Sequence, residues 1–346
     1  MKGLIVGLGL IVLTLIQVWD RAHAAERSKE LRPEVEAFVV EMSERHGFNA
    51  SALRRLLAKA RTQDAILRAM ARPGTARPWF EYRPRYVNPL RVADGLEFWS
   101  DNAATVARAS ERYGVPQEII VATLGVETNY GRDTGKFRVL DALYTLAFDW
   151  PPRAEYFRGE LEQFLLLARE YGIDPLQPRG SYAGAMGIAQ FMPSSYRKYA
   201  VDFDGSGRPD LSRSADAIGS VANYMNAFGW KPGGLVAVPA DAQGDRVDEF
   251  VDMGLEPKVS VESLAEAGIR PQAGATEPGT TEAALVRLQG EEGPLYFLGF
   301  TNFYVITRYN RSVNYAMSLF DLAEELAAAR ASTADATLET KPTHRP

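Results

Sequence analysis

The sequence of 346 residues contains no cysteine. This absence excludes disulfides, thiolate zinc sites, cysteine nucleophiles and a lipoprotein acylated on an N-terminal cysteine. Histidine is almost as scarce, since the chain holds His23, His46 and His344 alone. His23 falls in a predicted leader and His344 is third from the end, so a catalytic triad or a histidine-ligated metal would depend on His46. Carboxylates, hydroxyls and amides remain as the groups for chemistry.

The chain also lacks an excess of positive charge. Lys and Arg number 39 against 44 Asp and Glu, which gives a net charge of −5. This balance provides no general attraction to nucleic acid, and we predict no nucleic-acid partner. Hydrophobic residues make up 46% and charged residues 24%, a composition typical of globular proteins. The length suits two or three domains.

The first 24 residues have the pattern of a secretory signal peptide. Lys2 precedes an uncharged, apolar run at residues 3–19, and the small-x-small pattern Ala22-His23-Ala24 follows. We predict cleavage after Ala24 and export to the periplasm. The alternative is an uncleaved membrane anchor, which we favour less because a 17-residue run is at the short limit for a spanning helix.

Hydrophobic periodicity and turn residues predict an α+β fold that is mostly α-helical. Between residues 231 and 294, 15 of 64 residues are glycine or proline, and short β-like pieces occur at residues 235–238 and 258–261. The predicted parts are a signal peptide (1–24), an N-terminal helical domain (31–112, joined by a helix at 312–329), a catalytic core (113–230 plus 295–311), a small α/β insertion (231–294) and a disordered tail (330–346).

Three helices are expected in the N-terminal domain. Apolar residues recur at helical spacing in residues 33–45 and 52–71, and a capped helix is expected at residues 101–113 after Trp99-Ser100. Three prolines between residues 78 and 89 predict an extended link between these helices.

A glutamate ends the most apolar of the expected helices. Residues 119–126 carry no charge, and Ile120, Leu124 and Glu127 share one helix face. Apolar surroundings disfavour an ionised carboxylate and raise its pKa, as a general acid near neutral pH requires. The alternative is an ordinary glutamate at a helix end, facing solvent or paired with Arg132.

Motifs around this glutamate resemble those of the type-B lytic murein transglycosylases. The helix ends in Glu127-Thr-Asn-Tyr-Gly131, and residues 184–193 read GAMGIAQFMP. Further similar segments, in order, are Arg153-Ala-Glu-Tyr-Phe157, Gly159-Glu-Leu161, Ser194-Ser-Tyr196, residues 216–224 and residues 309–315. Because the motifs recur in order over roughly residues 30–325, chance is a poor explanation.

The resemblance implies a lysozyme-like catalytic core and the activity of the family. Its members cleave the bond between N-acetylmuramic acid and N-acetylglucosamine in peptidoglycan and leave a 1,6-anhydro end. The resemblance assigns the single catalytic acid/base to Glu127. It assigns polar contacts around the cleaved sugar to Ser181, Gln190, Tyr224, Tyr309 and Asn310.

Some of these residues also have ordinary structural interpretations. Ser181 could be a turn residue, Tyr224 a core aromatic and Asn310 a helix cap. Arg153 could contact a carboxylate of the muropeptide or be a surface arginine. Pro152 stands where some relatives have a second basic residue, which leaves contacts to the peptide stem open.

Residues 202–208 match the start of an EF-hand calcium loop, with oxygen ligands at positions 1, 3 and 5 and glycine at position 6. Position 12 is Arg213, where a bidentate glutamate belongs, and Asp216 is the expected replacement, as the resemblance also indicates. The predicted ligands are Asp202, Asp204, Ser206, the Arg208 carbonyl and Asp216. We predict a structural Ca²⁺ and no cofactor for catalysis; the alternative is a turn without metal.

Counting carboxylates predicts the product. Common glycosidases use two, an acid and a nucleophile or base, but the polar positions that the resemblance places around the cleaved sugar are all neutral: Ser181, Gln190, Tyr224, Tyr309 and Asn310. The substrate's N-acetyl oxygen and C6 hydroxyl would then act in place of the second carboxylate and of water, leaving a 1,6-anhydro end.

Two other functions stay open at this point. A lysozyme-type hydrolase would act on the same glycan, and a non-catalytic scaffold would bind it. The predicted partners are peptidoglycan glycan strands and other cell-wall enzymes.

Overall fold

The computed structural model describes residues 31–71, 77–272 and 280–339, so the predicted signal peptide and its alternative, a membrane anchor, lie outside the described residues. The first elements are α2 (Pro33–His46), α3 (Ala50–Leu57), α4 (Asp64–Met70), α5 (Trp79–Tyr82), η2 (Arg83–Arg85), α6 (Pro89–Asp101), α7 (Ala103–Tyr113) and α8 (Gln117–Thr128). The middle elements are β1 (Phe137–Arg138), α9 (Val139–Asp149), η3 (Pro151–Arg153), α10 (Ala154–Tyr171), β2 (Arg179–Gly180), α11 (Pro193–Tyr199) and α12 (Ser214–Ala227). The last elements are β3 (Ala237–Ala242), α13 (Val247–Asp252), β4 (Val259–Ser260), α14 (Val261–Glu266), β5 (Ile269–Pro271), β6 (Glu282–Gln289), β7 (Pro294–Gly299), α15 (Thr301–Tyr309) and α16 (Val313–Glu339).

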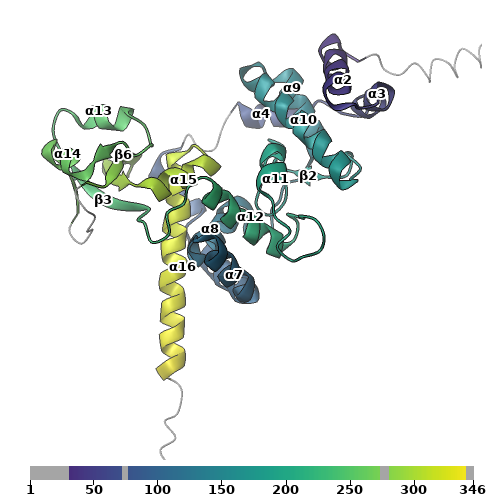
Figure 1. Ribbon diagram of the computed structural model, residues 1–346. Helices are drawn as coiled ribbons and strands as arrows, with labels where there is room; N and C mark the ends of the chain where they lie inside the picture. Colours follow the sequence, from purple (N-terminus) through teal and green to yellow (C-terminus); the bar gives the residue numbers. More distant parts are fainter. Residues whose placement is uncertain (1–30, 72–76, 273–279, 340–346) are drawn as a thin grey trace, which may run out of the picture.

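Helix α8 lies in the centre of the helical part of the molecule. It packs against α6, α7, α12 and α16, and Figure 1 shows α16 running past it. Residues 119–126 are all buried, as expected for a helix that is apolar on every side. Glu127 is therefore held at the end of the best-buried helix of this group.

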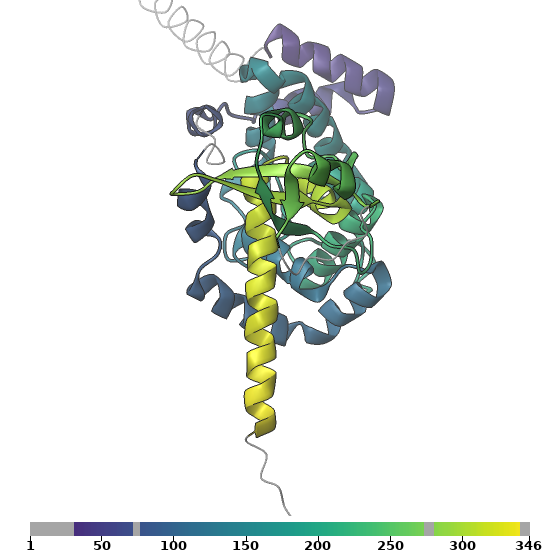
Figure 2. The ribbon, with the colours of Figure 1, turned by 90° about the vertical axis from the view of Figure 1, so that its left-hand side faces the viewer.

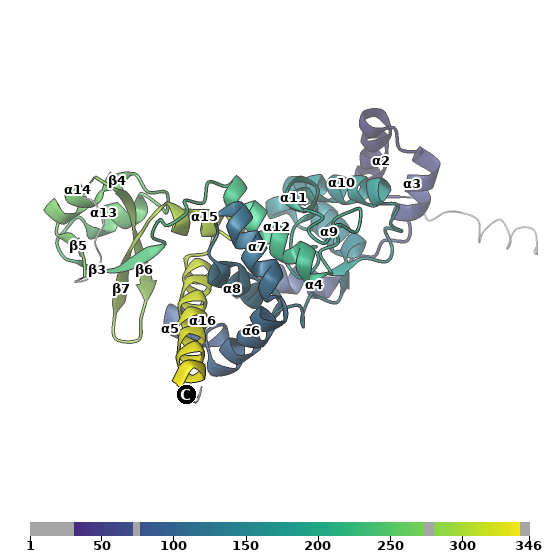
Figure 3. The ribbon, with the colours of Figure 1, turned by 60° about the horizontal axis from the view of Figure 1, so that its bottom comes forward.

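The N-terminal helices divide between two neighbours instead of forming one domain over residues 31–112. Helices α2 to α4 lie beside α9 and α10, as Figures 1 and 3 both show, whereas α6 and α7 pack on α8. The Phe38 ring meets Phe148 of α9 edge to face at 6.0 Å. Arg158 of α10 forms an ion pair with Glu41 of α2 at 2.5 Å. Long-range packing, which local periodicity does not report, decides the partner of each of these helices.

The single helix predicted at residues 52–71 is interrupted between α3 and α4. The backbone N–H of Arg61 donates to the Asp141 carboxylate at 3.0 Å, and that of Gln63 donates to the Thr145 hydroxyl at 3.0 Å. These contacts with α9 satisfy N–H groups that a continuous helix would otherwise bond internally. The interruption is thus a tertiary effect.

The prolines expected to form an extended link instead begin helical segments. Pro78 immediately precedes α5, Pro84 lies in η2 and Pro89 is the first residue of α6. Proline is suited to a first helical position, where its missing N–H has no partner to lose. The helix expected at residues 101–113 begins two residues later, at Ala103.

The α/β insertion is built on a five-stranded antiparallel sheet with strand order β4-β6-β7-β3-β5. Leu298 on β7 pairs with both Val238 on β3 and Leu285 on β6, and these side chains form one cluster with residues of α13 and α14. Figures 1 and 3 show this sheet to one side of the helical part, and Figure 2 shows it in front of those helices. Val286 and Leu288, from the same strand as Leu285, belong instead to the main core.

The predicted end of the insertion at residue 294 is wrong. All of strand β7 (Pro294–Gly299) after its first residue is expected in the catalytic core, but the strand lies between β6 and β3 in the sheet. The β pieces expected at residues 235–238 and 258–261 overlap β3 and β4. Strand pairing over long sequence distances sets this boundary, and apolar composition does not reveal it.

Helix α16 is longer than the helix predicted at residues 312–329, and Figure 2 shows it extending beyond the rest of the chain. Its alanines favour the helical conformation, and the Arg330 guanidinium lies 4.1 Å from the Trp99 ring centroid. Residues 330–339 are therefore helical and not a disordered tail, while residues 340–346 lie outside the described part. Within the described ranges, no helix is long and apolar enough to cross a membrane.

Candidate active site

The carboxylate of Glu127 receives a hydrogen bond from a tyrosine on another helix. Glu127 lies in the last turn of α8, and the Tyr315 hydroxyl donates to its Oε1 at 2.5 Å. Tyr315 lies in the first turn of α16 and is 3% exposed. Burial raises the pKa of Glu127 to about 7, and the Tyr315 hydrogen bond opposes this rise. Near neutral pH, this carboxyl group can therefore both give and take a proton.

Tyrosines form the surroundings of this carboxylate. The Tyr309 ring stacks on the Tyr315 ring with centroids 6.5 Å apart, and the Glu127 charge acts on Tyr82, Tyr224 and Tyr309. Burial raises the pKa of Tyr309 well above its usual value, so its hydroxyl remains protonated. Within the described structure, no second carboxylate is among the groups that shift the pKa of Glu127.

The residues after Glu127 end α8 and attach it to the active-site loop, our term for residues 184–193. Asn129 and Tyr130 have positive φ values of 52° and 60°, which stops the helix. The Thr128 hydroxyl donates to the Ile188 carbonyl at 2.9 Å and accepts the N–H of Gly131 at 2.9 Å. The motif thus positions the glutamate and this loop together.

Gln190 holds the active-site loop from within. Its Nε2 donates to the carbonyls of Gly187 at 2.9 Å and Thr134 at 3.1 Å, and its own φ is 50°. The Tyr309 hydroxyl donates to the neighbouring Ala189 carbonyl at 2.5 Å. The structure therefore brings Gln190 and Tyr309 to the same loop.

Tyr224 belongs to an aromatic cluster under this loop. Its ring centroid lies 4.8 Å from that of Tyr309 and 5.4 Å from that of Phe191, and its hydroxyl donates to the Arg308 carbonyl at 2.7 Å. It is buried, as the interpretation of a core aromatic requires. It also remains within range of the Glu127 charge.

Ser181 and Asn310 have local structural roles. The Ser181 Oγ accepts the N–H groups of Ala183 and Ala185 at 3.3 and 3.1 Å, which closes a turn. Asn310 is exposed, and its Oδ1 accepts the N–H of Ser312 at 3.1 Å just before α16. Ser181 thus closes a turn, as its structural interpretation states, whereas the Ser312 hydroxyl and not the Asn310 side chain accepts an N–H of the first turn of α16.

Arg153 is exposed and lies over aromatic rings. Its guanidinium carbon is 4.3 Å from the Tyr156 centroid and 5.2 Å from that of Phe157. Tyr156 is 42% exposed and lies within electrostatic range of Tyr224. Arg153 therefore presents a cation beside an exposed aromatic ring.

The cation loop, residues 202–216, gathers three carboxylates. Oxygens of Asp202, Asp204 and Asp216 lie within 4.8 Å of one another. The Ser206 hydroxyl lies 3.5 Å from an Asp202 oxygen and 3.4 Å from the Arg208 carbonyl oxygen. All five predicted donors are thus neighbours, and oxygen donors of this kind suit Ca²⁺.

Asp216 and Arg213 make further contacts in this loop. Asp216 is completely buried, and its oxygens accept the N–H groups of Phe203 at 2.7 Å and Asp210 at 2.7 Å. Arg213, at the position of the missing glutamate, pairs with Asp204 at 2.5 Å. The buried carboxylate of Asp216 fits a cation site, while the Arg213 guanidinium binds an oxygen of Asp204 that a cation would otherwise bind.

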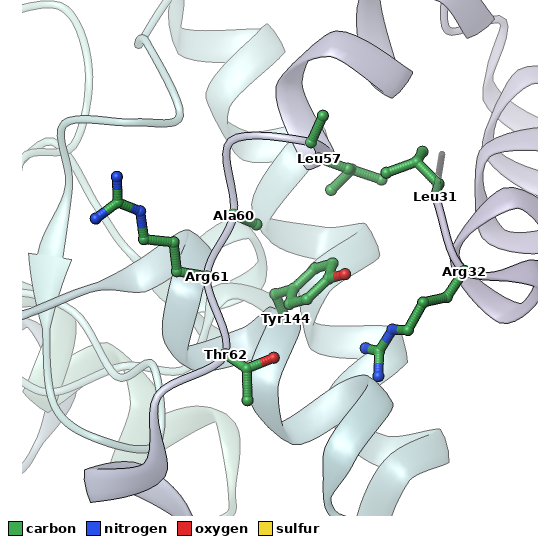
Figure 4. A pocket seen from close by; sticks show the side chains of 8 residues that line it. Leu31, Arg32, Leu57, Ala60, Arg61, Thr62 and Tyr144 are labelled. Atoms are coloured by element: carbon green, nitrogen blue, oxygen red, sulfur yellow. The ribbon is translucent and has the colours of Figure 1, made fainter. Parts of the chain in front are cut away.

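A cavity of about 400 Å³ lies between α9 and the segment that joins α3 to α4 (Figure 4). No predicted site residue lines it. The Thr62 hydroxyl at its wall donates to Asp149 at 2.8 Å, and Arg32 pairs with the same carboxylate at 2.6 Å. These polar groups already bind each other, so the cavity is not part of the candidate active site.

Sequence reasoning missed Tyr315 and Tyr82. Tyr315 ends the similar segment at residues 309–315, and that motif was the available signal, but no local pattern gives its side chain a role. Tyr82 lies within the proline-containing segment that was expected to be extended, so it had no expected position. Packing between distant parts of the chain bonds Tyr315 to Glu127 and brings Tyr82 within range of the Glu127 charge.

Comparisons with known proteins agree with this geometry. The family model described as "Transglycosylase SLT domain" matches residues 30–324. Membrane-bound lytic murein transglycosylase B of Escherichia coli (strain K12) is 45% identical over 310 residues, covering 86% of this chain and 84% of that protein.

Two solved structures match over the same part of the chain. Soluble lytic transglycosylase SltB1 from Pseudomonas aeruginosa is 46% identical with a TM-score of 0.80, covering 86% of this chain and 100% of that chain. Escherichia coli lytic transglycosylase Slt35 in complex with calcium is 46% identical with a TM-score of 0.77, covering 86% and 94%. The resemblance and the predicted fold class are thus confirmed, and the chain belongs to the lytic transglycosylase family defined by the transglycosylase SLT domain.

Proposed function

We propose that this protein cleaves the β-1,4 bond between N-acetylmuramic acid and N-acetylglucosamine in peptidoglycan and leaves 1,6-anhydro ends. The observation that carries this proposal is a single carboxyl group, Glu127, with a pKa raised to about 7 among neutral tyrosines. Family membership supports the substrate class, since the E. coli relative is a lytic murein transglycosylase.

Glu127 acts first as the general acid. Its protonated carboxyl gives a proton to the glycosidic oxygen, and the C1–O bond of the muramyl residue breaks. The N-acetyl oxygen of the same sugar attacks C1 and neutralises the developing positive charge, as in substrate-assisted glycosidases. The Tyr315 hydroxyl, which donates to Glu127 Oε1, stabilises the carboxylate left after the proton transfer.

Glu127 acts next as the base. Its carboxylate takes the proton of the C6 hydroxyl, O6 attacks C1, and the bond from C1 to the N-acetyl oxygen breaks. Glu127 ends the cycle protonated, as it began, and no water is consumed. The C6 hydroxyl outcompetes bulk water because it belongs to the same molecule and has a high effective concentration.

We propose that polar side chains around Glu127 orient the cleaved sugar. The proposed contacts are Ser181, Gln190, Tyr224, Tyr309 and Asn310, with Arg153 facing a carboxylate of the muropeptide. Gln190 and Tyr309 are supported by their shared contacts with the active-site loop. Ser181 and Asn310 have weaker support because their oxygens already accept backbone N–H groups.

Mass spectrometry of digested sacculi tests the reaction. Muramic acid ends lighter by one water than hydrolysed ends are expected, with no new reducing sugar. Predominantly reducing muramic acid ends would instead support the lysozyme-type hydrolase. Binding to sacculi without release of any fragment would support the scaffold.

We propose a structural Ca²⁺ held by the cation loop. The donor set and the complete burial of Asp216 support it, as does the calcium bound by the similar Slt35. Calcium would hold the loop through Asp202, Asp204, Ser206, the Arg208 carbonyl and Asp216. The chemistry at Glu127 does not require the ion.

We further propose that the protein works in the periplasm after signal-peptide cleavage, where it meets glycan strands and other cell-wall enzymes. N-terminal sequencing of the exported protein tests the first part. A chain that begins at Ala25 is expected, and one that retains residues 1–24 would support the anchor.

A further inference from the structure

One tyrosine joins the helix that follows the active-site loop to the cation loop. Tyr196 lies on α11, which begins at Pro193, the last residue of the active-site loop. Its hydroxyl donates to the Pro209 carbonyl at 3.2 Å and accepts the Leu211 N–H at 3.1 Å. The burial of Tyr196 raises its pKa to about 12, so the hydroxyl stays protonated and can make both bonds.

The residue between these two partners is bound to the candidate cation site. The N–H of Asp210 donates to Oδ2 of Asp216 at 2.7 Å. The Tyr196 hydroxyl therefore bonds to Pro209 and Leu211, and the residue between them bonds to the Asp216 carboxylate. These three hydrogen bonds together hold residues 209–211. A single hydrogen bond thus joins Asp216 to this segment.

The same segment supports the active-site loop. The Leu211 carbonyl accepts the N–H of Ile188 at 2.8 Å. Gly187 approaches so closely that a Cβ there would lie 2.5 Å from the Leu211 Cβ. The Ile188 carbonyl in turn accepts the hydroxyl of Thr128, the neighbour of Glu127. Hydrogen bonds thus connect Asp216 with the end of α8.

A cavity of about 400 Å³ is bordered by Tyr196, Leu211, Gly187 and Ile188. Atoms that face a void lack contact partners on that side. Residues 209–211 therefore have fewer packing contacts on the side of the cavity, where the hydrogen bonds from Tyr196 and Asp216 hold them.

We propose that Tyr196 is a positioning residue that couples the cation loop to the active-site loop, so that calcium binding orders residues 184–193 and strengthens glycan binding. This inference rests on the proposed function of the active-site loop and on the proposed calcium site. Coupling of this kind is reciprocal, because two ligands that favour one arrangement increase each other's affinity by the same factor.

Hydrogen exchange of the peptide covering residues 184–193 tests the inference without turnover. The comparison uses the parent chain, Y196F and Y171F, each with and without CaCl₂. Tyr171 is the matched control: its ring meets Tyr196 edge to face at 6.1 Å, and its hydroxyl has no hydrogen-bond partner among the described residues. Y196F retains the buried ring and is expected to fold.

Calcium should slow exchange in this peptide by at least about fivefold in the parent and in Y171F, the lower range of allosteric coupling. The effect should disappear in Y196F. Calcium should likewise lower the KM for sacculus glycan in the parent and Y171F but not in Y196F, with kcat little changed. A general loss of stability would not change the KM while leaving kcat almost unaltered.

Two results would overturn the coupling. One is calcium-dependent protection in Y196F equal to that in Y171F, and the other is no calcium-dependent protection in the parent. Failure of the proposed function is distinguishable, because it would appear as reducing products or as full activity of E127Q, and the exchange measurement depends on neither.

Discussion

The hydroxyl of Tyr315 and Oε1 of Glu127 are 2.5 Å apart, so the first turn of α16 is bonded to the last turn of α8 at the candidate catalytic carboxylate. The two residues are 188 positions apart in the sequence. The bond favours the ionised carboxylate, while burial favours the protonated one, and burial has the larger effect. The balance leaves a group that titrates near neutral pH.

Replacing Glu127 with glutamine should lower turnover of sacculi by at least about a hundredfold, the lower range for general acid–base catalysis. Glutamine retains the size of glutamate and can accept the Tyr315 hydroxyl, but it cannot deliver a proton. The measurement is the rate of release of anhydromuropeptides. Near-parent activity in a folded E127Q would remove Glu127 from the proposed role.

The Y315F variant should move the alkaline limb of the pH profile of kcat/KM to higher pH. Loss of the hydroxyl removes a hydrogen bond to the carboxylate, so the pKa of Glu127 rises above about 7 and the acid stays protonated to higher pH. Y130F is a suitable control, because the Tyr130 hydroxyl donates to the Arg91 carbonyl and not to Glu127. A limb that stays in place, or moves equally in Y130F, contradicts this account.

The raised pKa also predicts a pH-dependent stability difference. Between the unfolded pKa of about 4.5 and the folded pKa of about 7, the folded protein binds more protons than the unfolded chain, so stability falls as pH rises. E127Q does not titrate there and should exceed the parent in free energy of unfolding at pH 8, by up to about 3 kcal/mol. The gain should be absent at pH 4. Denaturant unfolding at both pH values measures it, and an equal difference at the two would refute this origin.

Calcium should raise the melting temperature of the parent, because a ligand that binds the folded state alone stabilises it by mass action. D202A should abolish the rise, since Asp202 is one of the three clustered carboxylates. D245A removes an exposed acid outside the cation loop and should leave the rise unchanged. Equal shifts in D202A and D245A would show that calcium acts elsewhere.

Residues near one another in the sequence determined much of the candidate site. The uncharged run that precedes Glu127 is by itself enough to require a buried helix. Burial of the Glu127 carboxyl group at the end of this run then raises its pKa. The glycines of residues 184–193 likewise permit the positive φ values and the close approach to Leu211 seen at Gly187. The spacing of Asp202, Asp204 and Ser206 was sufficient to predict one turn that gathers oxygen donors.

Other features depended on contacts between residues far apart in the chain. The N–H groups of Arg61 and Gln63 bond to α9 and end α3 early, and β7 joins the sheet because β6 and β3 lie on either side of it. Tyr315 reaches Glu127 only because α16 packs along α8. Periodicity and spacing report which face of an element is apolar, but they do not identify the element that covers it. That choice is made by the packing of the whole chain, which is why the sequence predicted the acid and the tertiary structure supplied its hydrogen-bond donor.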